Sequence, residues 1–234
     1  MMTNHAPRPD HAGEGRTYTH PDVLRAAAAG ADWADPITDP TLIDWAPRQA
    51  AAQIWFEVVD GRPVNPHAPT GIRYGRNELG HWGEKAAADA LVLATGPDGR
   101  RRALLVERSD GHGWAVPGGC LDPEETPLAA AVRELEEETG LDLPGAAWRV
   151  TPVRYVPDPR ASDEAWMVTV LCIADLGPIE TFPAVAGADD AARAEWVLAN
   201  DYQALVEDLA ATYGGRVFGA HVEMLREALQ PTEH

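Results

Sequence analysis

Residues 119–141 read GCLDPEETPLAAAVRELEEETGL, and this stretch decides the fold. Within it, residues 125–139 carry the strongest helix signal in the chain, because apolar side chains recur at intervals of three and four residues. At about 100° per residue, and with Glu134 placed at zero, Glu137 lies near 300° and Glu138 near 40° around the helix axis. The three carboxylates therefore share one face of the predicted helix.

The buried stripe of this helix is predicted at Leu128, Val132, Leu135 and Thr139, which fall between about 100° and 160° on the same scale. The acidic face is therefore expected to point away from the core. Like charges four residues apart repel, and glutamates in the last turns oppose the helix dipole. One explanation is a solvated acidic face on an acidic protein. The other is a hard divalent cation held by several carboxylate oxygens, which removes both penalties.

The spacing of the stretch favours the cation. Five residues separate Gly119 from Glu125, and seven more separate Glu125 from the pair Arg133-Glu134. An apolar residue and one further residue then lead to Glu137-Glu138, and Gly140 follows before another apolar residue. This complete pattern resembles the signature of the Nudix superfamily, and a chance match to so many fixed positions is rare.

The resemblance implies a fold of the α/β (α+β) class, in which a mixed β-sheet is sandwiched between helices. It also implies that Glu134, Glu137 and Glu138 bind Mg²⁺, with Mn²⁺ as a substitute. The carbonyl group of Gly118 or Gly119 often completes the coordination in this family. Such an ion would neutralise phosphate charge, position a water molecule and lower its pKa.

Further residues gain expected roles from the same resemblance. Arg133 would be a catalytic residue that orients a glutamate through a charge-assisted hydrogen bond, with Glu125 supporting it. The superfamily often supplies another carboxylate from a loop, and here Asp189 and Asp190 precede an expected strand, with Asp190 as the preferred catalytic candidate. The alternative for both is a helix or turn cap. The sequence does not reveal which group accepts the proton from water.

A narrower resemblance lies mostly outside this signature. Residues 33–36, 61–89, 114–119, 158–167 and 187–191 are similar, in unbroken order, to the mitochondrial-type ADP-ribose pyrophosphatases. The same family includes the ADP-ribose-sensing domain of a melastatin-type cation channel. The similarity covers nearly the whole chain from about residue 17. It implies Mg²⁺-dependent hydrolysis of ADP-ribose to AMP and ribose 5-phosphate.

By this narrower resemblance, Asp158 and Arg160 would contact the ribose and phosphates of the substrate, and Tyr213 would lie near it. The alternatives are a turn-forming side chain before proline for Asp158, a surface salt bridge for Arg160 and a core aromatic for Tyr213. Arg216 stands where the family carries His, so the sequence departs from the pattern there.

Two other functions stay open. The chain would hydrolyse another nucleoside diphosphate derivative (NADH, a nucleotide sugar or a dinucleoside polyphosphate), because the signature does not name the second group. Alternatively it would be a non-catalytic ADP-ribose-binding module. Sensors of that kind lose the glutamates that this chain retains at Glu134, Glu137 and Glu138.

Composition restricts the partners. The net charge of −18 disfavours nucleic acid and anionic membranes, which leaves a small nucleoside diphosphate substrate. The eight His lack HxH or HExxH spacing, so no zinc site is expected. We expect a cytoplasmic protein, because the two cysteines form no CxxC pair and the chain shows neither an apolar run of membrane-spanning length nor a secretory signal. It is expected to be a monomer or a homodimer.

Three parts are expected along the chain. Residues 1–16 should form a disordered tail, residues 17–85 a small N-terminal domain and residues 86–230 the Nudix catalytic domain. The N-terminal part should contain a short helix before Gly30, an irregular segment over residues 33–50 and a tight turn at Asp60-Gly61. The catalytic part should alternate strands with the helix over 125–139 and close with one or two helices.

Overall fold

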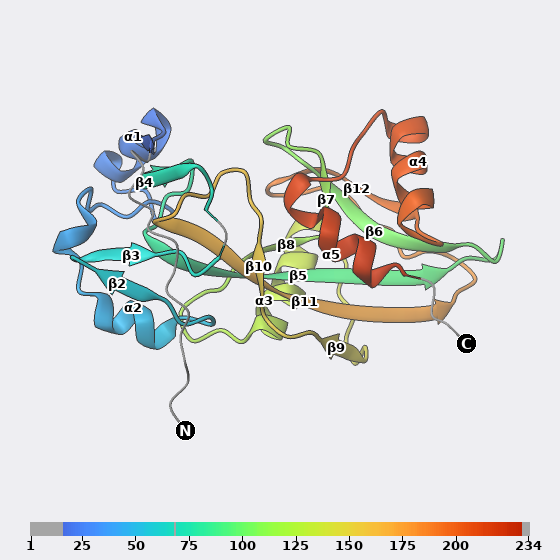
Figure 1. The fold of residues 1–234 in the computed structure, drawn as a ribbon. Coiled ribbons are helices and arrows are strands. Elements are labelled where there is room, and N and C mark those ends of the chain that lie inside the picture. Colours follow the sequence, from blue (N-terminus) through green and yellow to red (C-terminus); the bar gives the residue numbers. More distant parts are fainter. Residues whose placement is uncertain (1–15, 68, 231–234) are drawn as a thin grey trace, which may run out of the picture.

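The computed structural model describes residues 16–67 and 69–230. Its main feature is an eight-stranded mixed sheet with the strand order β10-β11-β5-β6-β12, which β7, β8 and β9 extend by pairing with β6, β5 and β11. These strands are β5 (Gly83–Thr95), β6 (Arg101–Arg108), β7 (Trp114–Ala115), β8 (Gly118–Cys120), β9 (Trp148–Val150), β10 (Arg154–Val156), β11 (Ala165–Pro178) and β12 (Ala191–Leu198). The parallel pair β5 and β11 runs from the N-terminal elements to the opposite end of the molecule (Figure 1).

Helices cover the sheet, and the alternation of side chains along each strand explains how. Successive side chains of a strand point to opposite faces, and here both sets are apolar. Ala90, Val92 and Leu104 pack with α3 (Pro127–Thr139). Leu91, Leu93 and Leu105 pack with α4 (Tyr202–Tyr213) and α5 (Val222–Ala228), which follows the short 3-10 helix η2 (Gly219–His221). The predicted mixed sheet between helices is confirmed.

The N-terminal part consists of short elements. They are β1 (Arg16–Thr19), α1 (Pro21–Ala29), η1 (Pro40–Leu42), α2 (Trp45–Ala51), β2 (Glu57–Val59), β3 (Arg62–Val64) and β4 (Ile72–Asn77). Strand β1 pairs with β4, and the hairpin of β2 and β3 turns at the expected Asp60-Gly61, where both residues have positive φ. An aromatic cluster of Trp45, Phe56 and Trp166 joins this part to β11.

Several expectations for the N-terminal part need comment. Residues 33–50 are not irregular throughout, because α2 begins at Trp45, capped by Asp44, whose carboxylate accepts from the Ala46 N–H. The tail expected over residues 1–16 lies outside the described residues except for Arg16, which belongs to β1. The domain division at residues 85 and 86 stays a prediction, and it falls inside β5.

No helix within residues 16–67 and 69–230 is long and apolar enough to span a membrane.

Candidate active site

A cavity of about 370 Å³ opens where two central strands separate. Strands β5 and β6 pair only between Leu93–Thr95 and Arg101–Ala103, and beyond that point β5 pairs with β8 while β6 pairs with β7. Of the predicted site residues, the cavity is lined by Gly118, Gly119, Arg133, Glu134, Glu137, Glu138, Asp158, Arg160, Asp189 and Asp190. The structure thus brings together predicted residues from four separate segments and does not bring Tyr213 among them.

Helix α3 supplies the carboxylates. It begins at Pro127, where Thr126 caps it by accepting from the Ala129 N–H, and it ends at Gly140, whose φ of 70° suits glycine. Leu135 and Thr139 are buried as predicted. The expectation that the whole acidic face points away from the core is wrong for Glu138, which is 6% exposed, although it holds for Glu137, whose side chain is 48% exposed.

Glu138 is a buried carboxylate without a cationic partner. It accepts one hydrogen bond, at 3.0 Å from the Gly118 N–H, and no Lys, Arg or His within the described part of the chain makes a salt bridge with it. Burial is the main reason why the pKa of Glu138 is raised to about 8. The carboxylates of Glu134 and Asp190 act in the same direction, whereas the Gly118 N–H and the charge of Arg108 act against it. An isolated buried charge is costly, so this position favours a bound cation.

Arg133 binds the other carboxylates. Its guanidinium contacts Glu125 at 2.9 Å, Glu134 at 2.8 Å and Glu137 at 3.0 Å. These hydrogen bonds raise the pKa of Arg133, and the bond with Glu125 has the largest effect. Burial raises the pKa of Glu134, and Arg133 opposes that shift. Arg133 therefore orients two of the three predicted metal-binding glutamates, and Glu125 holds Arg133 in turn.

Two glycines let carboxylate side chains approach the backbone. A Cβ atom on Gly119 would lie 2.2 Å from Glu134 Oε1, and one on Gly118 would lie 2.4 Å from Asp89 Oδ1. Any larger residue at either position would have to displace a carboxylate. Strand β8 is thus the support on which the side chains of α3 rest.

The residues present fit the Mg²⁺ that the family resemblance implies. Among the described residues no Lys, Arg or His side chain pairs with Glu138, and Gly119 leaves room for Glu134 to lie against the backbone. Carboxylate and carbonyl oxygens are the ligands that hard divalent cations prefer. Across the described residues, no three or more His, Cys, Asp or Glu side chains are already gathered closely enough to hold an ion. Arg133 holds Glu134 and Glu137 instead, so binding would require these side chains to shift.

A loop before β12 carries Asp189 and Asp190. The free carbonyl groups at the end of α3 hold it, because the Ala186 N–H donates to Thr139 O and the Ala188 N–H donates to Glu138 O. The Asp190 carbonyl accepts from the Ser109 N–H at 2.9 Å. Both aspartates line the cavity, so the loop is anchored directly to the glutamate helix.

A second loop, residues 157–164, carries Asp158 and Arg160. Asp158 is 6% exposed, accepts from the Arg160 N–H at 2.8 Å and pairs with the Arg160 guanidinium at 2.6 Å. Burial opposes ionisation of Arg160, but Asp158 outweighs it and raises the pKa of Arg160. The turn-forming role that sequence left open for Asp158 therefore coexists with a place on the cavity wall.

The N-terminal part holds this second loop. The Asn77 amide donates to Pro159 O and Ala161 O, each at 3.1 Å, and the Glu78 N–H donates to Arg160 O at 3.2 Å. The Asp163 carboxylate accepts from the Thr70 N–H at 2.8 Å. Thr70, Asn77 and Glu78 of the N-terminal part thus fix the backbone around Arg160.

Some lining residues were missed by sequence reasoning. Asp89, Thr169 and His221 are buried in the cavity floor, where the Thr169 hydroxyl donates to Asp89 Oδ2 at 2.6 Å. Arg108 and Phe218 lie beside them. Asp89 had one usable signal, since it is the only charged residue in the apolar run 86–95. Nothing comparable marks His221 or Phe218.

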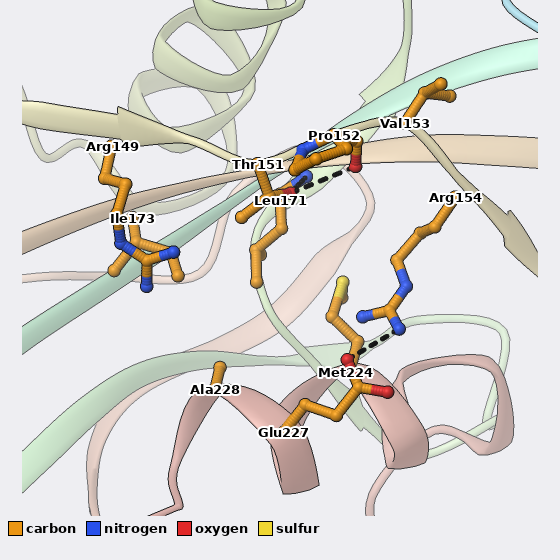
Figure 2. A pocket seen from close by; sticks show the side chains of 10 residues that line it. All are labelled: Arg149, Thr151, Pro152, Val153, Arg154, Leu171, Ile173, Met224, Glu227 and Ala228. Atoms are coloured by element: carbon orange, nitrogen blue, oxygen red, sulfur yellow. Dashed lines mark hydrogen bonds and ion pairs between the residues drawn. The ribbon is translucent and has the colours of Figure 1, made fainter. Parts of the chain in front are cut away.

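Tyr213 lies elsewhere. Its ring packs against Trp114, with the ring centroids 5.0 Å apart, in the apolar layer beneath α4. Tyr213 therefore lies where a core aromatic residue would, as the sequence left open, and it does not line the cavity. A separate cavity of about 420 Å³ lies between residues 149–154 and α5, and none of the predicted site residues lines it (Figure 2).

Several known proteins are similar to this chain. A family model described as the NUDIX domain matches residues 85–214. The "Putative nudix hydrolase 6" of Caenorhabditis elegans is 34% identical over 206 residues, covering 80% of this chain and 79% of that protein. The rat protein "ADP-ribose pyrophosphatase, mitochondrial" is 29% identical over 225 residues, covering 79% of this chain and 62% of that protein. A structure of the NUDIX domain of Shewanella oneidensis NrtR with ADP ribose has 21% identity and a TM-score of 0.46, covering 62% of this chain and 86% of that one.

Proposed function

The chain belongs to the Nudix family, and from that premise we propose that it hydrolyses the pyrophosphate bond of ADP-ribose in a Mg²⁺-dependent reaction. Water attacks one phosphorus, the bridging P–O bond breaks, and AMP and ribose 5-phosphate leave. The observation that carries the proposal is one cavity in which Glu138 and Glu134 face the loop with Asp158 and Arg160. Similarity to the rat pyrophosphatase over most of the chain supports this choice of substrate.

Each residue has a role that follows from its contacts. Glu134, Glu137 and Glu138, with a carbonyl of Gly118 or Gly119, would hold Mg²⁺, and Mn²⁺ would substitute for it. When bound, such an ion neutralises phosphate charge and lowers the pKa of a water molecule. The remaining roles belong to the chain itself.

Arg133 keeps Glu134 and Glu137 in place through its fork of hydrogen bonds. Arg160, held by Asp158, presents a guanidinium to the ribose and phosphates. Asp190, on its loop beside α3, is the proposed carboxylate outside the helix, either for the metal or as the proton acceptor. Tyr213, expected to lie near the ligand, packs against Trp114, and neither ring lines the cavity.

A substrate screen tests the proposal. ADP-ribose, NADH, UDP-glucose and diadenosine polyphosphates are incubated with the protein and Mg²⁺, and the products are resolved by chromatography. We expect the highest kcat/KM for ADP-ribose, with AMP and ribose 5-phosphate as products, and no turnover in EDTA until Mg²⁺ or Mn²⁺ is added. Equal kcat/KM for NADH or UDP-glucose would reject ADP-ribose as the preferred substrate. Binding of ADP-ribose without turnover would make the chain a sensor.

We also propose a cytoplasmic location. Cys120 and Cys172 are both unpaired, and free thiols suit a reducing compartment. Fractionation of cells that express the protein tests this directly.

A further inference from the structure

Strand β6 ends in an arginine that sequence reasoning did not single out. The guanidinium of Arg108 lines the cavity and is held by Asp110, which accepts from its Nε at 3.1 Å and its Nη2 at 2.5 Å. The Asp110 carboxylate is itself fixed, because it accepts from the His112 N–H at 3.0 Å. The adjacent Ser109 N–H donates to the Asp190 carbonyl. Arg108 therefore stands beside the loop of Asp190, on a rigid turn.

A second arginine, Arg160, lies near the same ring of Phe218 in a matching arrangement. Arg108 lies 4.8 Å from the centre of this ring and Arg160 lies 5.7 Å from it. The Asp158 carboxylate accepts hydrogen bonds from Nε and Nη2 of Arg160, as the Asp110 carboxylate does from Arg108. In both pairs, no residue within 16–67 or 69–230 bonds to the arginine Nη1 group. Two guanidinium groups near one aromatic ring thus each keep an Nη1 group that can donate hydrogen bonds to a ligand.

Such an arrangement is unusual in a chain with a net charge of −18, and two neighbouring cations repel. Each aspartate offsets this repulsion and holds its arginine extended. A ligand with two adjacent anionic groups would complete the arrangement, since guanidinium groups bind phosphate oxygens in a fork.

We propose that Arg108 is a second substrate-binding residue that contacts the diphosphate together with Arg160, and that Asp110 is its positioning residue. The inference rests on the proposed function for the identity of the substrate, but its chemistry requires only a diphosphate. Arg108 holds the phosphate nearer to Asp190, and Arg160 holds the part of the ligand nearer to Asp158. The pair aligns the anhydride near Phe218.

The same strand offers a matched control. Arg102 pairs with Asp98 at 2.7 Å and lies 5.0 Å from the centre of the Phe182 ring, so it repeats the chemistry of Arg108. It does not line the cavity. Arg108→Gln and Arg102→Gln remove the same charge from the same strand and differ only in their relation to the site.

Two measurements test the proposal. The first is the affinity for methylenediphosphonate, a diphosphate analogue that cannot be hydrolysed, measured by calorimetry with Mg²⁺ present. We expect Arg108→Gln to weaken binding by about tenfold, Arg108→Lys by less and Arg102→Gln hardly at all, because a charge-assisted hydrogen bond is lost only at the site. The second is ADP-ribose hydrolysis, where KM should rise in Arg108→Gln by a larger factor than kcat falls.

Asp110→Asn tests positioning. It should raise KM in the wild-type background and have no further effect in the Arg108→Gln background, because Asp110 acts only through Arg108. Equal affinities of the Arg108→Gln and Arg102→Gln variants for the analogue would overturn the proposal, as would a wild-type protein that does not bind it. If the wild type binds the analogue and Arg108→Gln weakens it while ADP-ribose is not cleaved, the proposed substrate fails and the role of Arg108 stands.

Discussion

Glu138 combines two properties that rarely occur together in a stable fold. It is 6% exposed, and it has no cationic neighbour within salt-bridge distance in the described residues. Glu136, two residues earlier on the same helix, is exposed to solvent. These two glutamates therefore give a direct comparison between a carboxylate in the cavity and one on the surface.

We expect Glu138→Gln to lower kcat by roughly 10²-fold or more, since the variant keeps the size of the side chain and loses a charge at the proposed metal site. In EDTA the melting temperature should stay equal or rise slightly, because burial already disfavours the charged form of Glu138 and the amide carries no charge. Glu136→Gln should change neither quantity. Indistinguishable behaviour of the two variants in steady-state kinetics and thermal melts would remove Glu138 from the site.

Gly119 is the second residue whose chemistry is directly testable. In Gly119→Ala, the new methyl group would lie 2.2 Å from Glu134 Oε1, so Glu134 must move away from the chain. We expect kcat to fall by about tenfold or more with a small change in melting temperature. Gly219→Ala is the control, because its Cβ meets nothing within 4 Å and its φ is not positive. A kcat equal to that of the control would show that Glu134 need not lie against Gly119.

At the scale of elements, the loop over residues 157–164 depends on β4 and the turn after it. Asn77 has a φ of 49° and is 5% exposed, and its amide holds the carbonyls of Pro159 and Ala161. This side chain links the N-terminal part to the backbone around Arg160, together with the Glu78 N–H. The helix α3, by contrast, rests on β8 and has no such link to residue 77.

Asn77→Gly should separate recognition from chemistry. Glycine adopts the positive φ without strain, so the variant loses the two hydrogen bonds and little else. We expect KM for ADP-ribose to rise by about threefold to tenfold while kcat changes less. Asp60→Gly, at a φ of 51° in the β2–β3 turn, is the matched control and should leave KM unchanged. A fall in kcat with an unchanged KM would contradict this role of Asn77.

The elements also show what sequence can and cannot predict. The helix over 127–139 and its glutamates were predictable because their spacing is a local property, whereas burial of Glu138 depends on β8 and the Asp190 loop. Helix α2 was missed because Asp35-Pro36 and Asp39-Pro40 suggest an irregular segment. The helix starts only after the second of these, and its own Pro47 lies in the first turn, where proline is tolerated. His221 and Phe218 reach the cavity through tertiary packing alone.

At the scale of the whole molecule, the two parts of the chain meet around His81. Its Nε2 atom lies 3.0 Å from Trp166 O of β11. Burial lowers the pKa of His81 from 6.5 to about 4, against the effect of the Trp166 carbonyl. Between these two pH values the unfolded chain binds a proton that the folded protein does not. Stability from neutral His81 is therefore fully present above pH 6.5 and is lost as the pH falls toward 4.

His81→Gln should remove this pH dependence. The free energy of unfolding in urea should fall between pH 7 and pH 5 by about 1 to 2 kcal/mol more in the wild type than in the variant, from the size of the pKa shift. Carboxylates contribute to both proteins and cancel in the difference. Identical pH slopes would mean that His81 is protonated in the folded state at pH 5.

The attachment of the 157–164 loop to the N-terminal part has a consequence for how such enzymes diversify. The glutamates proposed to support hydrolysis and the arginine proposed to bind the ligand are held by separate stretches of the chain. Mutations in one stretch should therefore have little effect on the side chains that the other stretch holds. A lineage could keep its reaction while the segment around residues 70–78 changes to favour a different substrate. Grafting that segment between relatives should transfer substrate preference rather than rate.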